Sequence, residues 1–267
     1  MKYFASLFLL LSITMGCKSF KKGWNDLNVF PVSYDIELGK QVSGDIASKA
    51  KDFPILPESQ YPDVYRYIRK ITSKILNSGK VENKSQFAWE VKIIKDDKTL
   101  NAFATPGGYI YVYTGLIKYL DAEDQLAGVL AHEIAHADRR HSTKQLTKLL
   151  GTQILLDIVL NSVSDKKQAN ANIGKVTTAL IGLKFSRSHE AEADKYSVIY
   201  LCPTDYSADG AAAFFEKIKN NPTPPEWLST HPSSSHRVKD IHGEKTKLGC
   251  KGNRHHRSEY QRIKKML

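Results

Sequence analysis

The stretch VLAHEIAHADRRHS, residues 129–142, places His132, Glu133 and His136 in the spacing His-Glu-x-x-His. On a helix, the two histidines lie about 40° apart around the axis and one turn apart along it, so both can bind one ion. Glu133 lies about 100° round the helix, close enough to act as a base without binding that ion. The flanking residues are apolar, so the helix should be buried, and buried histidine and glutamate need polar partners. The stretch therefore predicts a core helix that carries a metal site.

A catalytic zinc site uses three protein ligands and keeps a fourth position open. His141 follows His136 by five residues, about 140° round a helix, and therefore on the wrong face for the third ligand. The stretch FSRSHEAEADKYS, residues 185–197, offers Glu190 and Asp194, which share a helix face because they are four residues apart. One carboxylate can bind zinc while the other accepts a hydrogen bond from the free N–H of a ligand histidine.

Other interpretations of this second stretch stay open. His189 and Glu192 are rival candidates for the third ligand. Alternatively, the two carboxylates form an exposed acidic helix face that pairs with Arg187 and Lys195. Five further histidines have no comparable argument and are expected at the surface: His141, His236, His242, His255 and His256.

The apolar spacing around the motif predicts a mostly helical α+β fold with a small β-hairpin edge beside the motif helix. Strands are expected within 87–97 and 109–115, with a hairpin at 101–113 that turns at Pro-Gly-Gly. Asp121 is expected to cap the motif helix. A polar loop is expected at 164–175, and an apolar helix at 149–163 that is buried or touches a membrane. The other helices are expected at 34–52, 62–76, 176–201 and 209–219, and from about Ser233.

The first 20 residues, MKYFASLFLLLSITMGCKSF, contain an apolar run too short to span a bilayer, which is typical of an export signal. Its end, residues 14–17, resembles the lipobox of bacterial lipoproteins, with Thr14 where Leu is usual. That resemblance implies that Cys17 carries lipid, and Lys18 after it implies the outer membrane. The alternative is an ordinary signal peptide cut near Gly16. We expect a signal peptide at 1–16, a lipidated N-terminus and tether at 17–33, one folded domain at 34–250 and a basic tail at 251–267.

The chain has 39 Lys and Arg against 28 Asp and Glu, a net charge of +11. These basic residues are dispersed, without the aromatic-interleaved clusters that follow a phosphate backbone, which argues against a nucleic-acid partner. Attraction to an anionic lipid surface fits the charge better. The densest basic run is the tail KGNRHHRSEYQRIKKML, residues 251–267, which is expected to be solvated.

With Cys17 lipidated, Cys202 and Cys250 remain as a pair. An even pair in an oxidising compartment predicts a disulfide, which would contribute about 4 kcal/mol in the chain-entropy model. Two unpaired thiols are the alternative.

Four motifs in order, spread over about residues 34–245, resemble the M48 family of zinc metalloendopeptidases. They are NAFATPGGYIYVYTGL at 101–116, the His-Glu-x-x-His motif, Ser-Arg-x-x-Glu-x-x-Ala-Asp at 186–194, and STHPSSSHR at 229–237. The chain looks like the small exported bacterial members of that family, without a tetratricopeptide extension.

The resemblance implies one zinc ion bound by His132, His136 and Glu190, with Glu133 as general base and Asp194 orienting a ligand histidine. His231 would donate to the oxyanion or, alternatively, occupy the fourth zinc position and hold the enzyme latent. Arg237 would anchor its loop. Substrate would bind in extended form as an added strand on the edge formed by Asn101, Ala102, Phe103 and Ala104.

These observations favour a lipid-anchored zinc endopeptidase on the periplasmic side of the outer membrane, acting on unfolded or misassembled envelope proteins. A chaperone that binds such proteins without cutting them is the main alternative. A module that binds anionic lipopolysaccharide or peptidoglycan would rest on charge alone.

Overall fold

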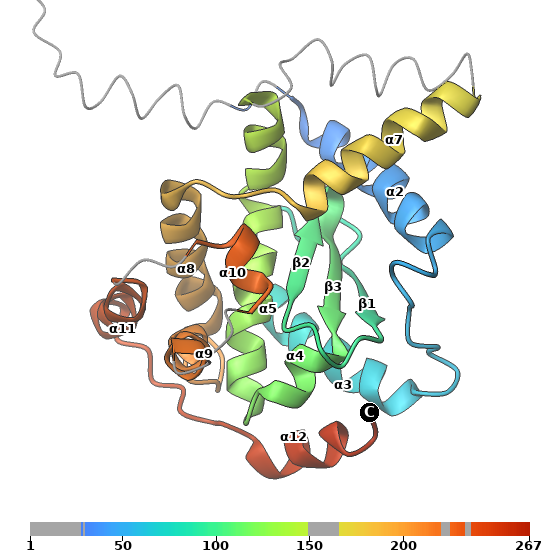
Figure 1. Cartoon of the computed structure of the whole chain (residues 1–267). Coiled ribbons are helices and arrows are strands. Elements are labelled where there is room, and N and C mark those ends of the chain that lie inside the picture. The colour runs from blue at the N-terminus through green and yellow to red at the C-terminus, as the bar shows by residue number, and fades with distance from the viewer. Residues whose placement is uncertain (1–27, 29, 149–165, 220–224, 233–235) are drawn as a thin grey trace, which may run out of the picture.

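A computed structural model describes residue 28 and residues 30–148, 166–219, 225–232 and 236–267 (Figure 1). Helices predominate, in agreement with the predicted α+β class. Their bounds are α2 Val32–Ser48, α3 Pro62–Leu76, α4 Thr114–Tyr119, α5 Glu123–Asp138, α7 Lys166–Ile181, α8 Arg187–Leu201, α9 Gly210–Lys219, α10 Trp227–Thr230, α11 Arg237–Leu248 and α12 Arg257–Lys264.

The strands of the described chain form one small sheet in the order β1-β3-β2. β2 (Ala102–Thr105) and β3 (Tyr109–Tyr113) make the predicted hairpin, and β1 (Glu90–Ile94) pairs with β3 in parallel. The turn between β2 and β3 uses Gly107 and Gly108 at φ 74° and 84°, a backbone region that glycine enters without strain. β2 stands at one end of the strand order and is therefore an edge strand. It lies against α5 (Figure 1).

Helix α5 runs through the middle of the molecule, between the sheet and the helices α8 and α9 (Figure 1). Every residue of α5 is buried, so the helix is enclosed on all sides rather than amphipathic. It meets α9 at very short range, because a Cβ added at Gly128 would lie 2.1 Å from the backbone nitrogen of Ala211. The core thus clamps the helix that carries His132, Glu133 and His136.

The start of α5 differs from the prediction that Asp121 caps it. The helix begins at Glu123 after Ala122, whose side chain makes no capping bond. The Glu123 N–H instead donates to the His255 carbonyl, so the C-terminal segment supplies the missing partner. Asp121 forms an ion pair with Lys217.

Two further helix predictions are wrong. The loop expected at 164–175 is helical from Lys166, the first residue of α7. The single helix expected at 176–201 is two helices, because α7 ends at Ile181 and α8 begins at Arg187. Ser186 caps α8 by accepting a hydrogen bond from the His189 N–H, which fixes a new helix start inside the predicted run.

The segment 251–267 is not a solvated tail. Its helix α12 buries Tyr260 and Ile263, and the Tyr260 hydroxyl donates to the Ile117 carbonyl at 2.8 Å. Just before this segment, Cys250 forms a disulfide with Cys202. The basic side chains that dominate the composition of the segment line its outer face, and two apolar ones anchor it.

The export signal, Cys17, most of the tether and the apolar run 149–163 lie outside the described residues. Within the described part, none of the helices combines the length and the apolar character needed to cross a bilayer.

Candidate metal centre

Helix α5 presents its two motif histidines to one point. Their Nε2 atoms lie 3.0 Å apart, and both side chains are 1% exposed. The spacing of four residues brings the rings one turn apart, as the motif predicts. Glu133, between them on the helix, is equally buried.

Helix α8 brings the two predicted carboxylates to different sides of these histidines. Glu190 Oε1 lies 3.4 Å from His136 Nε2, and its Oε2 lies 3.6 Å from His132 Nε2. Asp194 Oδ1 lies 3.0 Å from His132 Nδ1, on the far side of that ring. Glu190 therefore faces the same point as the two Nε2 atoms, whereas Asp194 holds the His132 ring from behind. Neither carboxylate belongs to an exposed acidic face.

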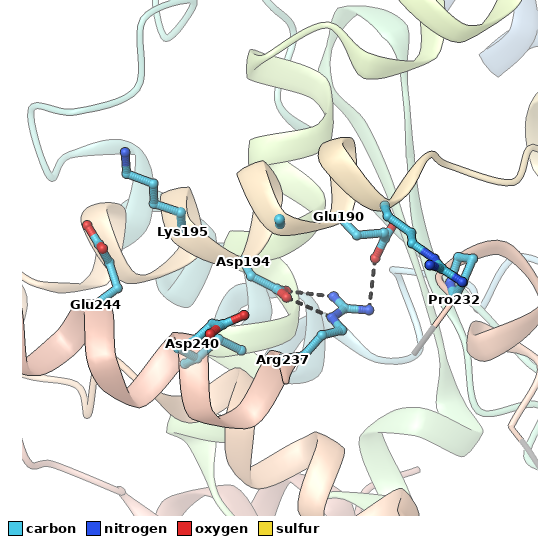
Figure 2. A pocket seen from close by; sticks show the side chains of 10 residues that line it. Glu190, Asp194, Lys195, Pro232, Arg237, Asp240 and Glu244 are labelled. Carbon is cyan, nitrogen blue, oxygen red and sulfur yellow. Dashed lines mark hydrogen bonds and ion pairs between the residues drawn. The ribbon is translucent and has the colours of Figure 1, made fainter. Parts of the chain in front are cut away.

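Arg237, at the start of α11, holds both carboxylates at the wall of a pocket between α8 and α11 (Figure 2). Its Nε and Nη2 donate to Asp194 at 2.7 and 2.6 Å, and its Nη1 lies 2.9 Å from Glu190 Oε2. Burial raises the pKa of Asp194, but the hydrogen bonds from His132 and Arg237 outweigh it and the pKa is lowered. The family resemblance implies that Arg237 anchors its loop, and the structure shows that it binds two site carboxylates.

His231 follows α10 and lies within the same cluster. Its Nδ1 is 3.1 Å from Glu190 Oε1 and 3.4 Å from His132 Nε2, and its Nε2 is 3.5 Å from Glu133 Oε1. Burial lowers the pKa of His231, but the negative charges of Glu133 and Glu190 outweigh it, so the pKa is raised. His231 therefore lies within reach of the same ion as the two motif histidines and Glu190.

Trp227, on α10, is a site residue that the sequence analysis missed. Its indole stacks on His231 with ring centroids 4.3 Å apart, and its Nε1–H donates to Glu133 Oε1 at 3.1 Å. Its backbone N–H donates to the Leu100 carbonyl at 3.2 Å, just before β2. A lone tryptophan in a Pro-rich stretch gives no periodicity signal, so only the fold reveals these contacts.

His141 is buried beneath the site, and the prediction that it is a surface residue is wrong. The prediction extended the helix past Asp138, but α5 ends there and Arg140 has φ 59°, which turns the chain back. His141 Nδ1 lies 3.0 Å from His136 Nδ1, and its Nε2 lies 3.3 Å from Glu192 Oε2.

The two rival ligands, His189 and Glu192, do not face the metal cluster. His189 stacks on His141 with ring centroids 4.4 Å apart, and Glu192 bonds to His141 and Arg139. Among the other histidines, His242 and His255 are about half exposed, as expected for surface residues.

The donor set of this cluster fits a cation. His132, His136, Glu190 and His231 each offer one ligand atom, and these four atoms lie within 4.8 Å of one another. His132 directs its Nδ1 to a carboxylate, so its Nε2 carries a lone pair, and Glu190 has no proton to donate while ionised. Burial raises the pKa of Glu190, but the opposing effect of His231 and His136 keeps it well below its usual value. A group of acceptor atoms that converge in a dry interior is the arrangement in which a cation binds well.

The predicted substrate edge lies beside this cluster. The Tyr113 N–H donates to the Asn101 carbonyl, so alternation along β2 turns the backbone groups of Asn101 and Phe103 towards β3. The backbone groups of Ala102 and Ala104 point the other way, to the free edge. The Leu100 carbonyl also points to the free edge, where it accepts the hydrogen bond from the Trp227 backbone N–H.

A buried His-Glu-x-x-His helix, a glutamate from a second helix and a small sheet with an edge strand alongside define a zincin-like fold. The model of peptidase family M48 matches residues 62–245, and the chain belongs to this family.

Two curated relatives illustrate the range of similarity. The mitochondrial metalloendopeptidase OMA1 of Schizosaccharomyces pombe is 26% identical over 228 residues, which cover 83% of this chain and 63% of that protein. The beta-barrel assembly-enhancing protease of Escherichia coli is 28% identical over 190 residues, which cover 67% of this chain and 38% of that protein. The chain thus spans less than two thirds of the length of either relative.

Proposed function

We propose that the protein is a zinc-dependent endopeptidase whose metal is held by His132, His136 and Glu190. The observation that carries this proposal is the convergence of ligand atoms from α5 and α8 in a buried site, with Glu133 beside them and outside the ligand set. Zinc bound there would supply a Lewis acid for the scissile carbonyl and lower the pKa of the attacking water. Family membership supports the same chemistry.

The chain's own groups divide the remaining work. The Glu133 carboxylate takes the proton of the attacking water and passes it to the leaving amine nitrogen. The Asp194 carboxylate, 3.0 Å from His132 Nδ1, favours the tautomer with its proton on Nδ1, which leaves Nε2 free to bind the metal. Arg237 fixes that carboxylate with two hydrogen bonds. Burial of the whole cluster excludes bulk water and strengthens each of these interactions.

We propose that the structure represents a latent, closed state. His231 lies 3.1 Å from Glu190 and 3.4 Å from His132, where it competes with water and substrate for the fourth position. A donor to the oxyanion would instead stand beside an open fourth position. Blocking is therefore the role that the geometry favours for His231, and activity requires α10 to move away.

Substrate binding is assigned to the edge of β2. The outward N–H and C=O groups of Ala102 and Ala104 can pair with an extended polypeptide. Pairing of this kind recognises the backbone of the polypeptide rather than its side chains. Such binding suits unfolded or misassembled proteins. Because Trp227 holds the adjacent Leu100 carbonyl, movement of α10 would open the edge and the fourth metal position together.

We further propose that these substrates are proteins of the bacterial cell envelope. The export signal and the lipobox-like residues 14–17 support a lipoprotein anchored through Cys17 in the outer membrane. One relative is named a beta-barrel assembly-enhancing protease, which agrees with this location. Labelling with a fatty acid tests the anchor: the wild type should take up label, and Cys17→Ser should take up none.

The central experiment measures metal content and casein cleavage side by side on the full chain and on Glu133→Gln. Both forms should bind one zinc, and only the wild type should cut. If both bind zinc and neither cuts, His231→Ala should release activity from the latent state. Absence of bound metal from the wild type would refute the zinc site, and zinc binding without cleavage in His231→Ala would favour a binding-only, chaperone-like role.

A further inference from the structure

The two motif histidines are held from behind in two different ways. On the His132 side, the ring nitrogen Nδ1 lies 3.0 Å from a carboxylate oxygen of Asp194. His136 directs its Nδ1 to a second imidazole, His141 Nδ1, at 3.0 Å. His141 is 0% exposed, so neither ring nitrogen can exchange its partner for water. A contact between two histidines in the interior needs a defined arrangement of protons.

Only one arrangement satisfies all the contacts. When His136 binds the metal through Nε2, its proton resides on Nδ1, because a neutral imidazole carries one N–H. His141 Nδ1 must then be the acceptor, which puts the His141 proton on Nε2. That N–H points at Glu192 Oε2, 3.3 Å away.

The series of contacts from His136 through His141 ends at Glu192, whose carboxylate is held by an arginine. Arg139 Nε donates to Glu192 Oε1 at 2.9 Å, and its Nη1 forms an ion pair with Glu82. The Arg139 guanidinium also lies 4.6 Å from the centre of the Tyr196 ring. Asp194 and Arg237 terminate the His132 side, and Glu192 and Arg139 terminate the His136 side in the same way. Both ligand histidines thus end on a carboxylate clamped by an arginine, with one extra imidazole inserted on the second side.

We propose that His141 is a positioning residue for the metal: it fixes the tautomer and ring orientation of His136 and thereby raises the zinc affinity of the site. The inference rests on the proposed zinc site but assigns a separate residue to it. Partners of ligand histidines typically change metal affinity by about 10- to 100-fold when removed. The alternative is that His141 only packs in the core and does not affect the tautomer of His136.

Three substitutions in the full chain separate these roles. His141→Leu removes the acceptor and keeps much of the volume, whereas in His141→Asn the amide oxygen takes the place of Nδ1. His189→Leu is the matched control, since His189 packs face to face on His141 and its ring nitrogens have no hydrogen-bond partner among the described residues. Zinc affinity is measured by competition with a chromophoric chelator, and folding by thermal melting of the metal-free proteins.

We expect His141→Leu to bind zinc about 10- to 100-fold more weakly, and His141→Asn and His189→Leu to remain within about threefold of the wild type. Unchanged affinity in a folded His141→Leu, or equal losses in the Asn and Leu variants, would overturn the inference and leave the zinc site intact. If His141→Leu does not fold, Glu192→Gln replaces it and should bind several-fold more weakly, and unchanged affinity there counts against the inference. A wild type that binds no zinc would instead overturn the proposed function itself, and this inference with it.

Discussion

Replacing Trp227 by phenylalanine tests whether α10 holds the active site shut. The indole Nε1–H donates to Glu133 Oε1 at 3.1 Å, and its ring stacks on His231. Phenylalanine removes the donor while it keeps an aromatic ring against His231 and the backbone bond to the Leu100 carbonyl. The substitution therefore weakens one contact of the closed state and leaves the ligand atoms untouched.

The size of the effect follows from the lost hydrogen bond. A bond to a charged acceptor contributes about 1.5–3 kcal/mol. Among the described residues, this buried Glu133 oxygen also contacts His231 Nε2, 3.5 Å away. In the open state this carboxylate faces water or substrate, so the loss falls on the closed state. The closed-to-open ratio should then shift by about 10- to 150-fold. While the open form is a minor population, kcat/KM should rise by the same factor.

Cleavage of a fluorescently labelled casein by the zinc-loaded full chain measures this rise. His231→Ala should raise kcat/KM as well. The double variant should gain less than the product of the two effects, because the Trp227 and His231 rings contact each other and each substitution weakens the same closed contact. A fall in kcat/KM in Trp227→Phe, at unchanged zinc content and melting temperature, would refute the reasoning. It would mean that the indole orients Glu133 for the reaction rather than holding it closed.

Three further predictions concern stability. Cys202→Ser opens a disulfide that spans a sequence separation of 48 residues. Thermal melting should show a free energy of unfolding about 4 kcal/mol smaller and a melting temperature about 8–16 °C lower. An unchanged melting temperature would contradict the chain-entropy argument. Gly128→Ala places a Cβ 2.1 Å from a backbone nitrogen of α9 and should destabilise the fold by at least about 1–3 kcal/mol in urea, whereas Gly243→Ala, with nothing within 4 Å, should be neutral or slightly stabilising. Burial raises the pKa of Asp209, but the hydrogen bond from Lys245 outweighs it and lowers the pKa from 3.8 to about 2. Since the pKa of Asp209 is lower in the folded state, this carboxylate stabilises the fold above about pH 4 and loses its effect as the pH falls towards 2. Its contribution is about 1 kcal/mol after solvent screening. Asp209→Asn should remove that part of the acid sensitivity of urea unfolding.

The parts of the fold and site that depend on local spacing were predictable from sequence. The helix expected at 62–76 has those bounds in α3, because its apolar residues recur with a helical period and a proline starts it. The meeting of His132 and His136 likewise follows from a spacing of four residues on a continuous helix. Glu190 and Asp194 share a helix face for the same reason, although only the fold shows that this face meets α5.

The parts that depend on a single backbone turn or on distant packing were not predictable. The left-handed conformation of Arg140 redirects His141 into the core, and no periodicity argument contains that turn. Helix α12 has a strongly basic sequence, so composition suggests a solvated tail, yet burial of Tyr260 outweighs that tendency. Its neighbour His255 supplies the backbone partner that starts the central helix, a long-range contact that sequence spacing cannot express.

The disulfide and the arginine clamp act on the same pair of helices from opposite ends. Glu190 lies in the first turn of α8, and Arg237 is the first residue of α11. Cys202 directly follows α8, and Cys250 follows the end of α11, so the covalent bond joins the two C-terminal ends. The helices are thus fastened at both ends in a parallel arrangement, and the carboxylates cannot shift along α11 without breaking one of these links. A bidentate bond to Arg237 needs this kind of fixed register, because a guanidinium fork is directional. An oxidising compartment would therefore support the metal centre as well as the fold, since the bond that it maintains keeps the clamp aligned.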